Sequence, residues 1–491
     1  MKSDVIVIGS GMSGMTAACL LAKEGFKVTV LEQNWIVGGC TSSYWRKGYV
    51  FESGATTLVG LDKNMPLEYL LETLGIDIPA VHLDLPMQVW LKNGQIINRY
   101  QDIRKWINEA ENIFGAKNQR SFWELCYQIS QFVWETSLKQ TSFPPTSWTD
   151  LKQVVKGFDF RQLKFAPYSL MSVEKLLKKF NLHQNADFVD FVNEQLLITA
   201  QNLAHEVNVL FGATALCYTN YANYYVNGGL INLVNPLVDY LKSKGGDIYL
   251  KNNVLKVSRV NNQYRVETKT MGKELHNIYW ADYLIAAIPL NNVLQIFDKE
   301  IIKKNISQKI MPSSKLNSAF QVGVGFVKKN EFQSIHHQVH LKKPLPQIGS
   351  KSVFVSFNHP KDFSRSDFNG HGVASISTHL PHPESNSILD KSIIEESILE
   401  RLEEIGLLEK SQIQYLHSST SKSWQKWTGR MFGFVGGYPQ YLKIKPWQMN
   451  EARLDNTKAY LCGDTAYPGQ GIPGVTLSGI IAYQKLKNDW M

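Results

Sequence analysis

The sequence predicts an α/β fold with more than one domain. Glycine-rich turns join a buried strand to a helix at both ends of the chain. Short β-rich runs occur after residue 315, and the region 103–205 has mainly helical periodicity. The length of 491 residues exceeds the roughly 250–300 residues at which one hydrophobic core stops growing. We therefore expect a discontinuous Rossmann-like domain, a second domain with a mixed or antiparallel sheet, and a helical insert.

The composition is that of an ordinary globular protein. Hydrophobic residues make up 44% of the chain and charged residues 19%. The net charge of +9 favours either an anionic partner, such as a membrane surface, or simple solubility. The cysteines lack the CxxC spacing, which argues against a zinc site or a disulfide framework and favours a reducing compartment. They are Cys19, Cys40, Cys126, Cys217 and Cys462.

The first residues do not resemble a secretory signal peptide. The apolar run 5–8 ends at Gly9 and does not extend into a longer hydrophobic region. The sequence contains no stretch of about 18 apolar residues free of charge, so a spanning helix is not expected. We expect a cytoplasmic protein whose contact with a membrane is peripheral.

A nucleotide-binding pattern lies near the N-terminus. A buried strand over residues 4–8 leads into Gly9, Gly11 and Gly14, and a second strand ends at Glu32. Glycines at this spacing allow a tight turn, the approach of a pyrophosphate to the backbone, and close helix–strand packing. The helix N-terminus favours negative charge, and the acidic residue accepts hydrogen bonds from ribose hydroxyls. The candidate binding residues are Gly9, Gly11, Met12, Ser13, Gly14, Glu32 and Gln33.

The acidic residue and a second glycine pair narrow the choice of nucleotide. An acidic residue at the strand end disfavours a 2′-phosphate, so FAD or NAD is favoured over NADP. Gly38 and Gly39 offer a second close approach along an extended cofactor, although a surface turn would give the same pattern. The glycine-containing segment 47–57 follows. The candidate residues of this region are Gly38, Gly39, Cys40, Thr41, Gly54, Ala55 and Thr56.

A second strand–turn–helix pattern lies near the C-terminus. Residues 459–463 read as a strand that ends at Gly463 and Asp464, and a segment rich in glycine and proline leads to a helix near Val475. Asp464 can accept a hydrogen bond from a ribityl or ribose hydroxyl. The helix N-terminus can stabilise negative charge on a reduced flavin. The candidate residues are Gly463, Asp464, Gly474, Val475 and Thr476.

Together these motifs resemble those of carotenoid desaturases, carotenoid isomerases and retinol saturases, the phytoene-desaturase-type members of the amine-oxidase-like flavoproteins. The resemblance covers both ends and the middle of the chain and leaves the helical insert unmatched. It rests on DVIVIGSGMSGMTAACLLAKEGFKVTVLEQ, KGYVFESGATT, YYVNGGLINLVNPLVDYLKSKGGDIYLKNNVLKV and GDTAYPGQGIPGVTLSGIIA. It implies that the dinucleotide is FAD.

The resemblance also bears on two single positions. It implies that the backbone of Val254 contacts the adenine of FAD, although an edge strand of the sheet is an alternative reading of this segment. Many desaturases carry arginine directly after the paired glycine, where this chain has Cys40. The absence of that charge favours the isomerase or saturase branch and does not remove the cofactor site.

The domain boundaries follow from the separation of these segments. We expect an FAD-binding domain of 1–75, 225–295 and 440–491, a substrate-binding domain of 76–102, 206–224 and 296–439, and an insert of 103–205. Strands of the substrate-binding domain are expected at 316–326, 352–357 and 373–379. His336, His337 and His340 are interpreted as part of a polar loop, and no metal ion is expected there.

The insert contains a basic stretch that is rich in aromatic residues. Residues 151–180 contain seven lysines and arginines and only two acidic residues. Phenylalanines and leucines lie between the basic residues. This pattern favours a helix that lies in a membrane interface. The alternative is an ordinary solvated helix that packs on its own domain. Nucleic acid is not an expected partner, because no recognition module accompanies the charge.

The function expected from these features is flavin chemistry on an apolar polyene. We expect FAD to carry the redox step, and no residue is assigned as catalytic. Because one dinucleotide motif is evident, electrons are expected to pass to an external acceptor such as oxygen or a quinone. The first hypothesis is desaturation of a membrane-derived carotenoid by hydride transfer to flavin. The alternatives are cis–trans isomerisation with reduced FAD, retinol-type saturation, a flavin-bearing carotenoid carrier and, at the superfamily level, amine oxidation.

Overall fold

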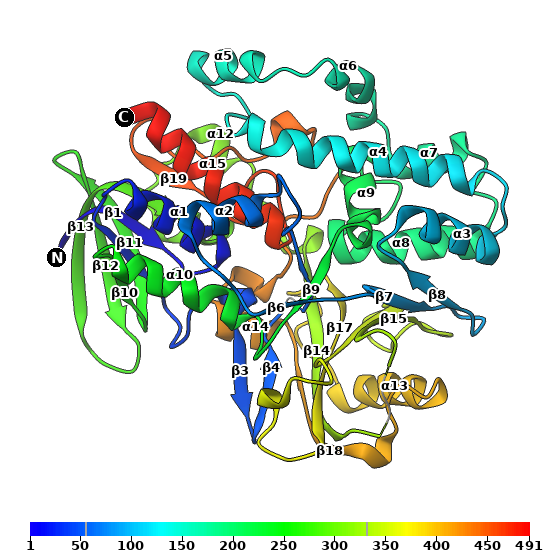
Figure 1. The fold of residues 1–491 in the computed structure, drawn as a ribbon. Helices are drawn as coiled ribbons and strands as arrows, with labels where there is room; N and C mark the ends of the chain where they lie inside the picture. The colour runs from blue at the N-terminus through cyan, green and yellow to red at the C-terminus, as the bar shows by residue number, and fades with distance from the viewer. Residues whose placement is uncertain (55, 330–331) are drawn as a thin grey trace.

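Two seven-stranded sheets form the framework of the molecule (Figure 1). The computed structural model describes residues 1–54, 56–329 and 332–491. The first sheet has the order β10-β2-β1-β13-β12-β11, and β19 also pairs with β13. Its strands are β1 (Lys2–Ile8), β2 (Val28–Leu31), β10 (Asp247–Tyr249), β11 (Asn252–Val260), β12 (Gln263–Thr270), β13 (His276–Ala286) and β19 (Ala459–Leu461). The predicted α/β fold is confirmed.

The centre of the first sheet is parallel. β1 pairs in parallel with β2 on one side and with β13 on the other. β13 pairs with antiparallel β12 along its first half and with parallel β19 along its second half. The carboxyl ends of β1, β2, β13 and β19 therefore lie at one edge of the sheet, which is where open α/β sheets bind ligands. Both ends and the middle of the chain meet at this edge.

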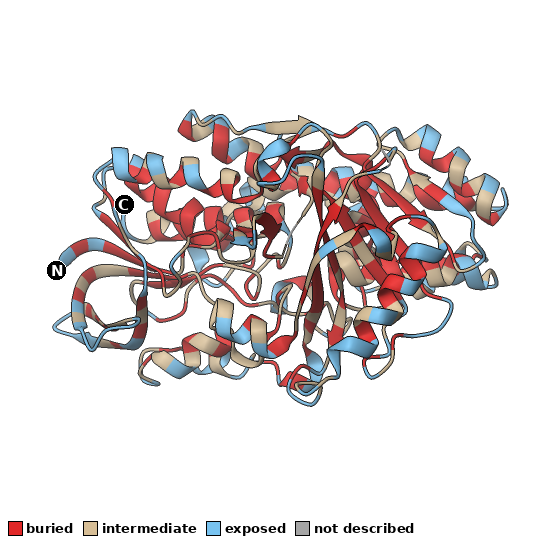
Figure 2. Cartoon of the chain, turned by 90° about the horizontal axis from the view of Figure 1, so that it is seen from below, coloured by how far each residue is buried: buried red, intermediate tan, exposed pale blue. Residues whose placement is uncertain are grey.

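Four helices contribute to the core of the first sheet. Its strands β1, β2 and β19 are mostly buried, whereas β11 and β12 mix buried with more exposed residues. Figure 2 shows such a mixture in the strands near the N-terminus. A Cβ atom at Gly479 would lie 2.5 Å from the Ser13 carbonyl oxygen, so glycine allows the last helix to approach the first turn of the first helix. The four helices are α1 (Met12–Lys23), α2 (Pro66–Leu74), α10 (Ile231–Ser243) and α15 (Ile472–Trp490).

The second sheet is mainly antiparallel and has the order β18-β14-β17-β16-β15-β7-β8. The strands expected at 316–326, 352–357 and 373–379 are present as β14, β16 and β17. One face of this sheet packs against α13 (Lys391–Glu404). The strands are β7 (Met87–Trp90), β8 (Ile96–Arg99), β14 (Asn317–Val327), β15 (His336–His340), β16 (Ser352–Phe357), β17 (His371–Pro381) and β18 (Ile413–Ser419).

The prediction of a polar loop for His336, His337 and His340 is wrong. All three lie on β15 and are buried. Polar partners inside the fold accommodate them: His336 Nδ1 lies 2.7 Å from Ser356 Oγ, and Trp90 Nε1 donates to His337 Nδ1 at 3.2 Å. Burial lowers the pKa of His336 and of His337 to about 3, so both rings are neutral near pH 7.

Two small sheets join the large ones. A hairpin of β3 (Ser43–Arg46) and β4 (Tyr49–Glu52) follows the second glycine pair. A three-stranded sheet has the order β5-β9-β6, with β5 (Leu58–Val59), β6 (Ala80–His82) and β9 (Asn223–Val226). A Cβ at Gly325 of β14 would lie 2.4 Å from the Tyr49 ring, so β4 packs directly on the second sheet.

The insert 103–205 is mainly helical, as predicted. Its core is aromatic, with Trp106, Trp123, Phe188 and Phe191 fully buried. Among the helices that the structure describes, none is long and apolar enough to cross a membrane. The helices are α3 (Ile103–Phe114), α4 (Gln119–Ser137), α5 (Trp148–Lys156), α6 (Arg161–Phe165), α7 (Val173–Lys179) and α8 (Ala186–Ala200), and α9 (Val209–Leu216) packs against them.

Apolar side chains project from α5, α6 and the turns beside them. Trp148, Val155, Phe160 and Leu163 are between 65% and 83% exposed. We call these four residues the α5–α6 face. Lysines lie between them in the sequence, as expected for the basic stretch.

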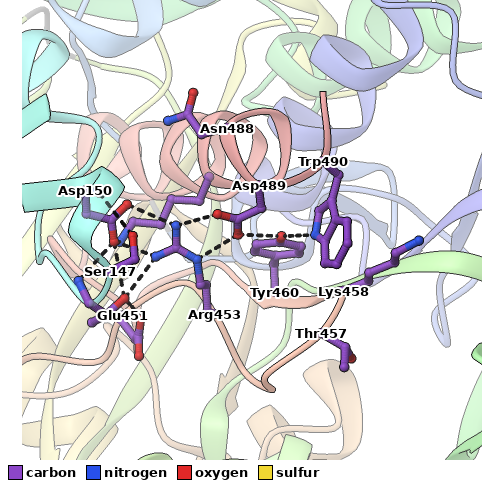
Figure 3. Close-up of polar contacts among 12 residues, drawn as sticks. Ser147, Asp150, Glu451, Arg453, Thr457, Lys458, Tyr460, Asn488, Asp489 and Trp490 are labelled. Carbon is purple, nitrogen blue, oxygen red and sulfur yellow. Dashed lines mark hydrogen bonds and ion pairs between the residues drawn. The ribbon is translucent and has the colours of Figure 1, made fainter. Parts of the chain in front are cut away.

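Asp150 anchors α5 to the C-terminal helix (Figure 3). Its fully buried carboxylate accepts hydrogen bonds from Arg453 Nη1 at 2.5 Å and from Lys485 Nζ at 3.3 Å. Arg453 Nε also donates to Asp489 Oδ2 at 2.7 Å. Burial opposes ionisation of Asp150, but Arg453 and Lys485 outweigh this effect and lower its pKa to about 2. The insert is therefore tied to α15 by a buried ionic network.

We predict that Asp150→Asn destabilises the protein, because two buried cations then lose their shared anion. Breaking such a pair costs about 3 kcal/mol. Urea unfolding followed by tryptophan fluorescence measures this loss. The matched control is Glu135→Gln, which removes an exposed partner of Arg161 in the same insert and should cost less than about 1 kcal/mol. Equal losses in the two variants would contradict the anchoring role.

The same carboxylate predicts the direction of a pH effect. Its pKa of about 2 in the folded protein is below the ordinary value of about 3.9. The ionised form therefore stabilises the fold above about pH 4, and this contribution is lost as the pH falls towards 2. The difference in unfolding free energy between the wild type and Asp150→Asn should shrink over that range. A difference that stays constant would contradict the assignment.

Candidate cofactor site

The turn after β1 is closely packed at two glycines and open at the third. Gly9 has a φ of +99°, and a Cβ there would lie 2.7 Å from the Ala287 carbonyl oxygen. A Cβ at Gly14 would lie 2.3 Å from the carbonyl oxygen of Gly9. At Gly11, by contrast, a Cβ would meet no described atom within 4 Å. The space above Gly11 is therefore open to a ligand.

The first turn of α1 borders this open space. Met12 and Ser13 begin the helix, and the N-cap residue Gly11 provides no side-chain hydrogen bond. The first N–H groups of a helix have no partner inside it, and together with the helix dipole they favour an anion. This end of α1 can therefore receive a phosphate group.

Glu32 holds a fixed, buried carboxylate at the end of β2. Its Oε2 accepts hydrogen bonds from the Ser10 N–H at 2.9 Å and from Ser10 Oγ at 2.7 Å. Its Oε1 accepts from the Asn34 N–H at 2.8 Å. Gln33 follows and packs against Gly429, where a Cβ would lie 2.1 Å from Gln33 Nε2. These contacts orient the carboxylate at the edge where the strands end.

The second glycine pair lies against the first glycine turn. Gly38 N–H donates to the Ser10 carbonyl oxygen at 3.1 Å, and Gly38 forms a bridge with Gly11. Gly38 and Gly39 have φ values of +98° and +57°. Thr41 closes the short turn, since its N–H donates to Gly38 O at 2.9 Å. The two glycine-rich segments, which are separate in the sequence, thus form one wall.

The segment after this wall reaches the second sheet. Cys40 is packed against Gly54, where a Cβ would lie 3.0 Å from the Cys40 carbonyl oxygen. Thr56 Oγ1 accepts a hydrogen bond from Ser356 Oγ at 2.8 Å. Ala55, the candidate between them, lies outside the residues that the structure describes.

Val254 lies on β11, which is the last strand of the first sheet. It pairs with Thr268 of β12, and a register irregularity follows it. The N–H of Asn252, at the start of β11, donates to the Glu32 carbonyl oxygen at 2.8 Å. The candidate adenine contact is therefore on an edge strand that begins beside Glu32, so the two readings of this segment are compatible.

The C-terminal segment adds a charged pair. Gly463 has a φ of +120°, and its N–H donates to Ser478 Oγ at 3.1 Å. Asp464 Oδ2 accepts a hydrogen bond from Arg430 Nη2 at 2.6 Å. Both side chains of this pair are mostly buried. The cation comes from a segment in which the sequence shows no motif.

The helix after this pair begins earlier than expected. α15 starts at Ile472, and its N-cap Gly471 provides no side-chain hydrogen bond. Val475 N–H donates to Gly471 O at 2.9 Å, and Thr476 Oγ1 donates to Ile472 O at 2.7 Å, so both groups are used within the helix. Of the three helix-terminal candidates, Gly474 has its N–H in the first turn of α15, where N–H groups have no partner inside the helix.

A small polar cavity is lined in part by Thr56, one of the candidate residues. Arg365 Nη1 donates to Glu52 Oε1 at 2.6 Å, and both side chains are almost fully buried. Burial opposes the charge of Arg365, but Glu52 outweighs this effect and raises the Arg365 pKa. Sequence reasoning did not bring these residues together, because each comes from a different strand or turn. The cavity is lined by Glu52, Thr56, Tyr225, His336, Ser356 and Arg365, among others.

The residues at the strand ends fit an extended dinucleotide. The open position at Gly11 and the uncapped ends of α1 and α15 provide N–H groups for anionic groups. Glu32 and Asp464 provide carboxylates for sugar hydroxyls. Arg430 Nη1 is buried and has no hydrogen-bond partner within 1–54, 56–329 and 332–491. A buried guanidinium nitrogen without a partner is expected where the hydrogen-bond acceptor belongs to a ligand.

Comparison with known proteins supports the same interpretation. A model of the family described as flavin containing amine oxidoreductase matches residues 12–485. The chain belongs to the flavin-containing amine oxidoreductases. This membership confirms the predicted FAD cofactor and the class of flavoprotein oxidoreductases.

The curated relatives of this flavin-containing oxidoreductase include carotenoid and retinoid proteins, which confirms the family resemblance. Prolycopene isomerase 1 from an Oncidium hybrid cultivar is 24% identical and aligns over 99% of this chain and 84% of its own length. A 4,4'-diaponeurosporene oxygenase from Staphylococcus haemolyticus is 22% identical over 97% of this chain and 96% of its own. The all-trans-retinol 13,14-reductase of Danio rerio is 25% identical over 50% of this chain and 41% of its own.

Solved structures share the fold at lower sequence identity. A putrescine oxidase variant superposes with a TM-score of 0.66 at 15% identity, over 99% of both chains. Cyclohexylamine oxidase from Brevibacterium oxydans gives a TM-score of 0.60 at 14% identity, over 99% of this chain and 98% of its own. These likenesses establish the architecture of the flavin-containing oxidoreductase.

Two glycine substitutions should separate cofactor binding from folding. Gly11→Ala should leave the stability of the apoprotein within about 0.5 kcal/mol, because its φ of −63° suits alanine and the space is open. It should weaken FAD binding at least about tenfold, as its methyl group occupies the cofactor's space. Gly14→Ala should instead destabilise the fold. Thermal unfolding of the apoprotein and FAD titration measure both effects, and normal FAD affinity in folded Gly11→Ala would contradict the site.

Proposed function

We propose that the flavoprotein acts on the conjugated double bonds of an apolar polyene of the carotenoid type, and that cis–trans isomerisation is its reaction. The main support is the alignment with prolycopene isomerases over 99% of the chain. Cys40 gives a second support, because the sequence lacks the arginine that many desaturases carry at that position.

Desaturation, the first expectation from the sequence, is the second candidate. It is favoured by relatives named as oxygenases of diaponeurosporene and diapolycopene, which align over 97–99% of the chain. An oxidative reaction would leave electrons on the cofactor and would require an external acceptor such as oxygen or a quinone. Isomerisation has no net redox change and requires no acceptor.

The chain's own residues would mainly bind, orient and exclude water. FAD, when bound, supplies the electron chemistry. The first-sheet edge would hold it through Gly11, Glu32 and Asp464. The small cavity lined by Glu52, Thr56 and Arg365 has room for little more than a water molecule, so we do not place the substrate there.

Product mass tests this proposal. We expect that purified protein with reduced FAD converts a poly-cis carotene to an isomer of unchanged mass. Loss of a hydrogen pair with oxidised FAD would select desaturation instead, and gain of a hydrogen pair would select saturation. Gly11→Ala serves as the control, assayed at an FAD concentration that saturates the wild type but leaves the variant mostly without cofactor. Unchanged polyenes under all of these conditions, with FAD fully bound, would contradict the proposal.

We also propose that the α5–α6 face contacts a membrane surface from which the polyene is drawn. Its four apolar side chains are exposed, and lysines beside them would favour anionic lipid headgroups. The Asp150 network supports this role, because it fixes α5 to the helix that begins at the cofactor site.

Vesicle binding tests the membrane contact. Phe160→Ser combined with Leu163→Ser should lower binding to vesicles of phosphatidylglycerol and phosphatidylcholine by at least about tenfold, because each buried apolar side chain contributes about 1.5–3 kcal/mol. The matched control is Phe363→Ser, since Phe363 is 79% exposed but lies outside the insert. Similar losses in the control and in the double variant, or no loss in either, would contradict the proposal.

A further inference from the structure

Arg430 lies in a segment that close contacts hold at both ends. It follows α14 (Ser421–Thr428) after Gly429, whose φ is +68°. Asn292 fixes the turn, because its side chain donates to Gly429 O at 2.8 Å and accepts from the Met431 N–H at 3.1 Å. Further along, a Cβ at Gly437 would lie 2.2 Å from the carbonyl oxygen of Asp464. The chain therefore presents Arg430 to the site in a defined position.

The guanidinium is only partly satisfied. Nη2 donates to Asp464 Oδ2 at 2.6 Å, and the guanidinium carbon lies 5.3 Å from the centre of the Phe434 ring. Nη1 is buried and has no hydrogen-bond partner among the described residues. A buried guanidinium nitrogen without an acceptor is costly, so native structures rarely keep one unless a ligand or water completes it.

The surroundings of Arg430 are those of the cofactor site. Cys40, which follows the second glycine pair, is close enough for the guanidinium to affect its thiol: burial raises the pKa of Cys40, and Arg430 opposes this rise. Asp464 ends the strand segment that leads to α15. Cys40 carries no charge. The positive charge near it belongs to Arg430, which comes from a distant part of the sequence.

We propose that Arg430 is a cofactor-binding residue whose Nη1 donates to an anionic oxygen of bound FAD. Asp464 holds the planar guanidinium in orientation through the other nitrogen. The anionic oxygen belongs either to the pyrophosphate or to the reduced flavin ring, and both would be bound by the same charge-assisted hydrogen bond. The proposal rests on the FAD cofactor and is independent of the polyene substrate.

The test compares Arg430→Gln with the wild type in two measurements. The Kd of FAD, obtained by titrating the apoprotein, should rise about 10–100-fold, which is the range for one hydrogen bond to a charged group. The reduction potential of bound flavin then distinguishes the acceptor. A shift to more negative values identifies the reduced ring, and an unchanged potential with the raised Kd identifies the pyrophosphate.

The matched control is Arg401→Gln on α13. Arg401 is also mostly buried, pairs with Glu404 at 2.9 Å and has a buried nitrogen without a partner among the described residues, but it lies behind the second sheet. Its Kd for FAD should be unchanged. If Arg430→Gln does not fold, Arg430→Lys, which keeps the charge and loses the planar fork, serves for the same comparison.

A second comparison tests the alternative that Arg430 only neutralises the charge of Asp464. If this alternative held, Arg430→Gln would have no effect on FAD binding in a protein that already carries Asp464→Asn, because the charge is then absent. We expect the Kd of the double variant to remain at least about tenfold above that of Asp464→Asn alone. A Kd within twofold in this background, or an unchanged Kd and potential in Arg430→Gln, would overturn the proposal.

Discussion

The parallel pairing of β1 between β2 and β13 is the constraint on which the site depends. Three backbone hydrogen bonds extend the parallel alignment beyond the strand ends. They run from Gly9 N–H to Leu31 O, from Ala287 N–H to Ile8 O, and from Cys462 N–H to Ala286 O, at 2.8–3.0 Å. They align four segments of different sequence position, so that the glycine turns and both carboxylates share one edge. A shift of register in any strand would separate them.

Glycine is the second physical requirement, and its role differs between positions. Gly14 and Gly479 have no room for a side chain, since a Cβ would meet backbone at 2.3 Å and 2.5 Å. These contacts set the spacing of α1 against β1 and of α15 against α1. At Gly11 the structure leaves room that we propose the cofactor fills. The pattern of glycines thus combines packing and binding, and the sequence alone does not separate the two roles.

The sequence predicts what is local and leaves open what depends on packing between distant segments. The glycine turns, the strands of the second sheet and the helical insert follow from short-range periodicity. The histidines of β15 did not, because polar residues suggested a loop while Ser356 and Trp90 satisfy two of them inside the sheet. Arg430 and the pair of Glu52 and Arg365 could not be found either, since their partners are far away in the chain. The only sequence feature that could have drawn attention to this segment is the group of glycines around Arg430.

The central claim is that FAD binds where the strand ends converge, with contacts from separate parts of the chain. Hydrogen exchange of the apoprotein with and without FAD measures this most directly. The account predicts that FAD slows exchange together in residues 9–14, 38–41, 463–465 and 472–476, while α13 is unaffected. Protection confined to the N-terminal turn, or spread evenly over both sheets, would contradict it.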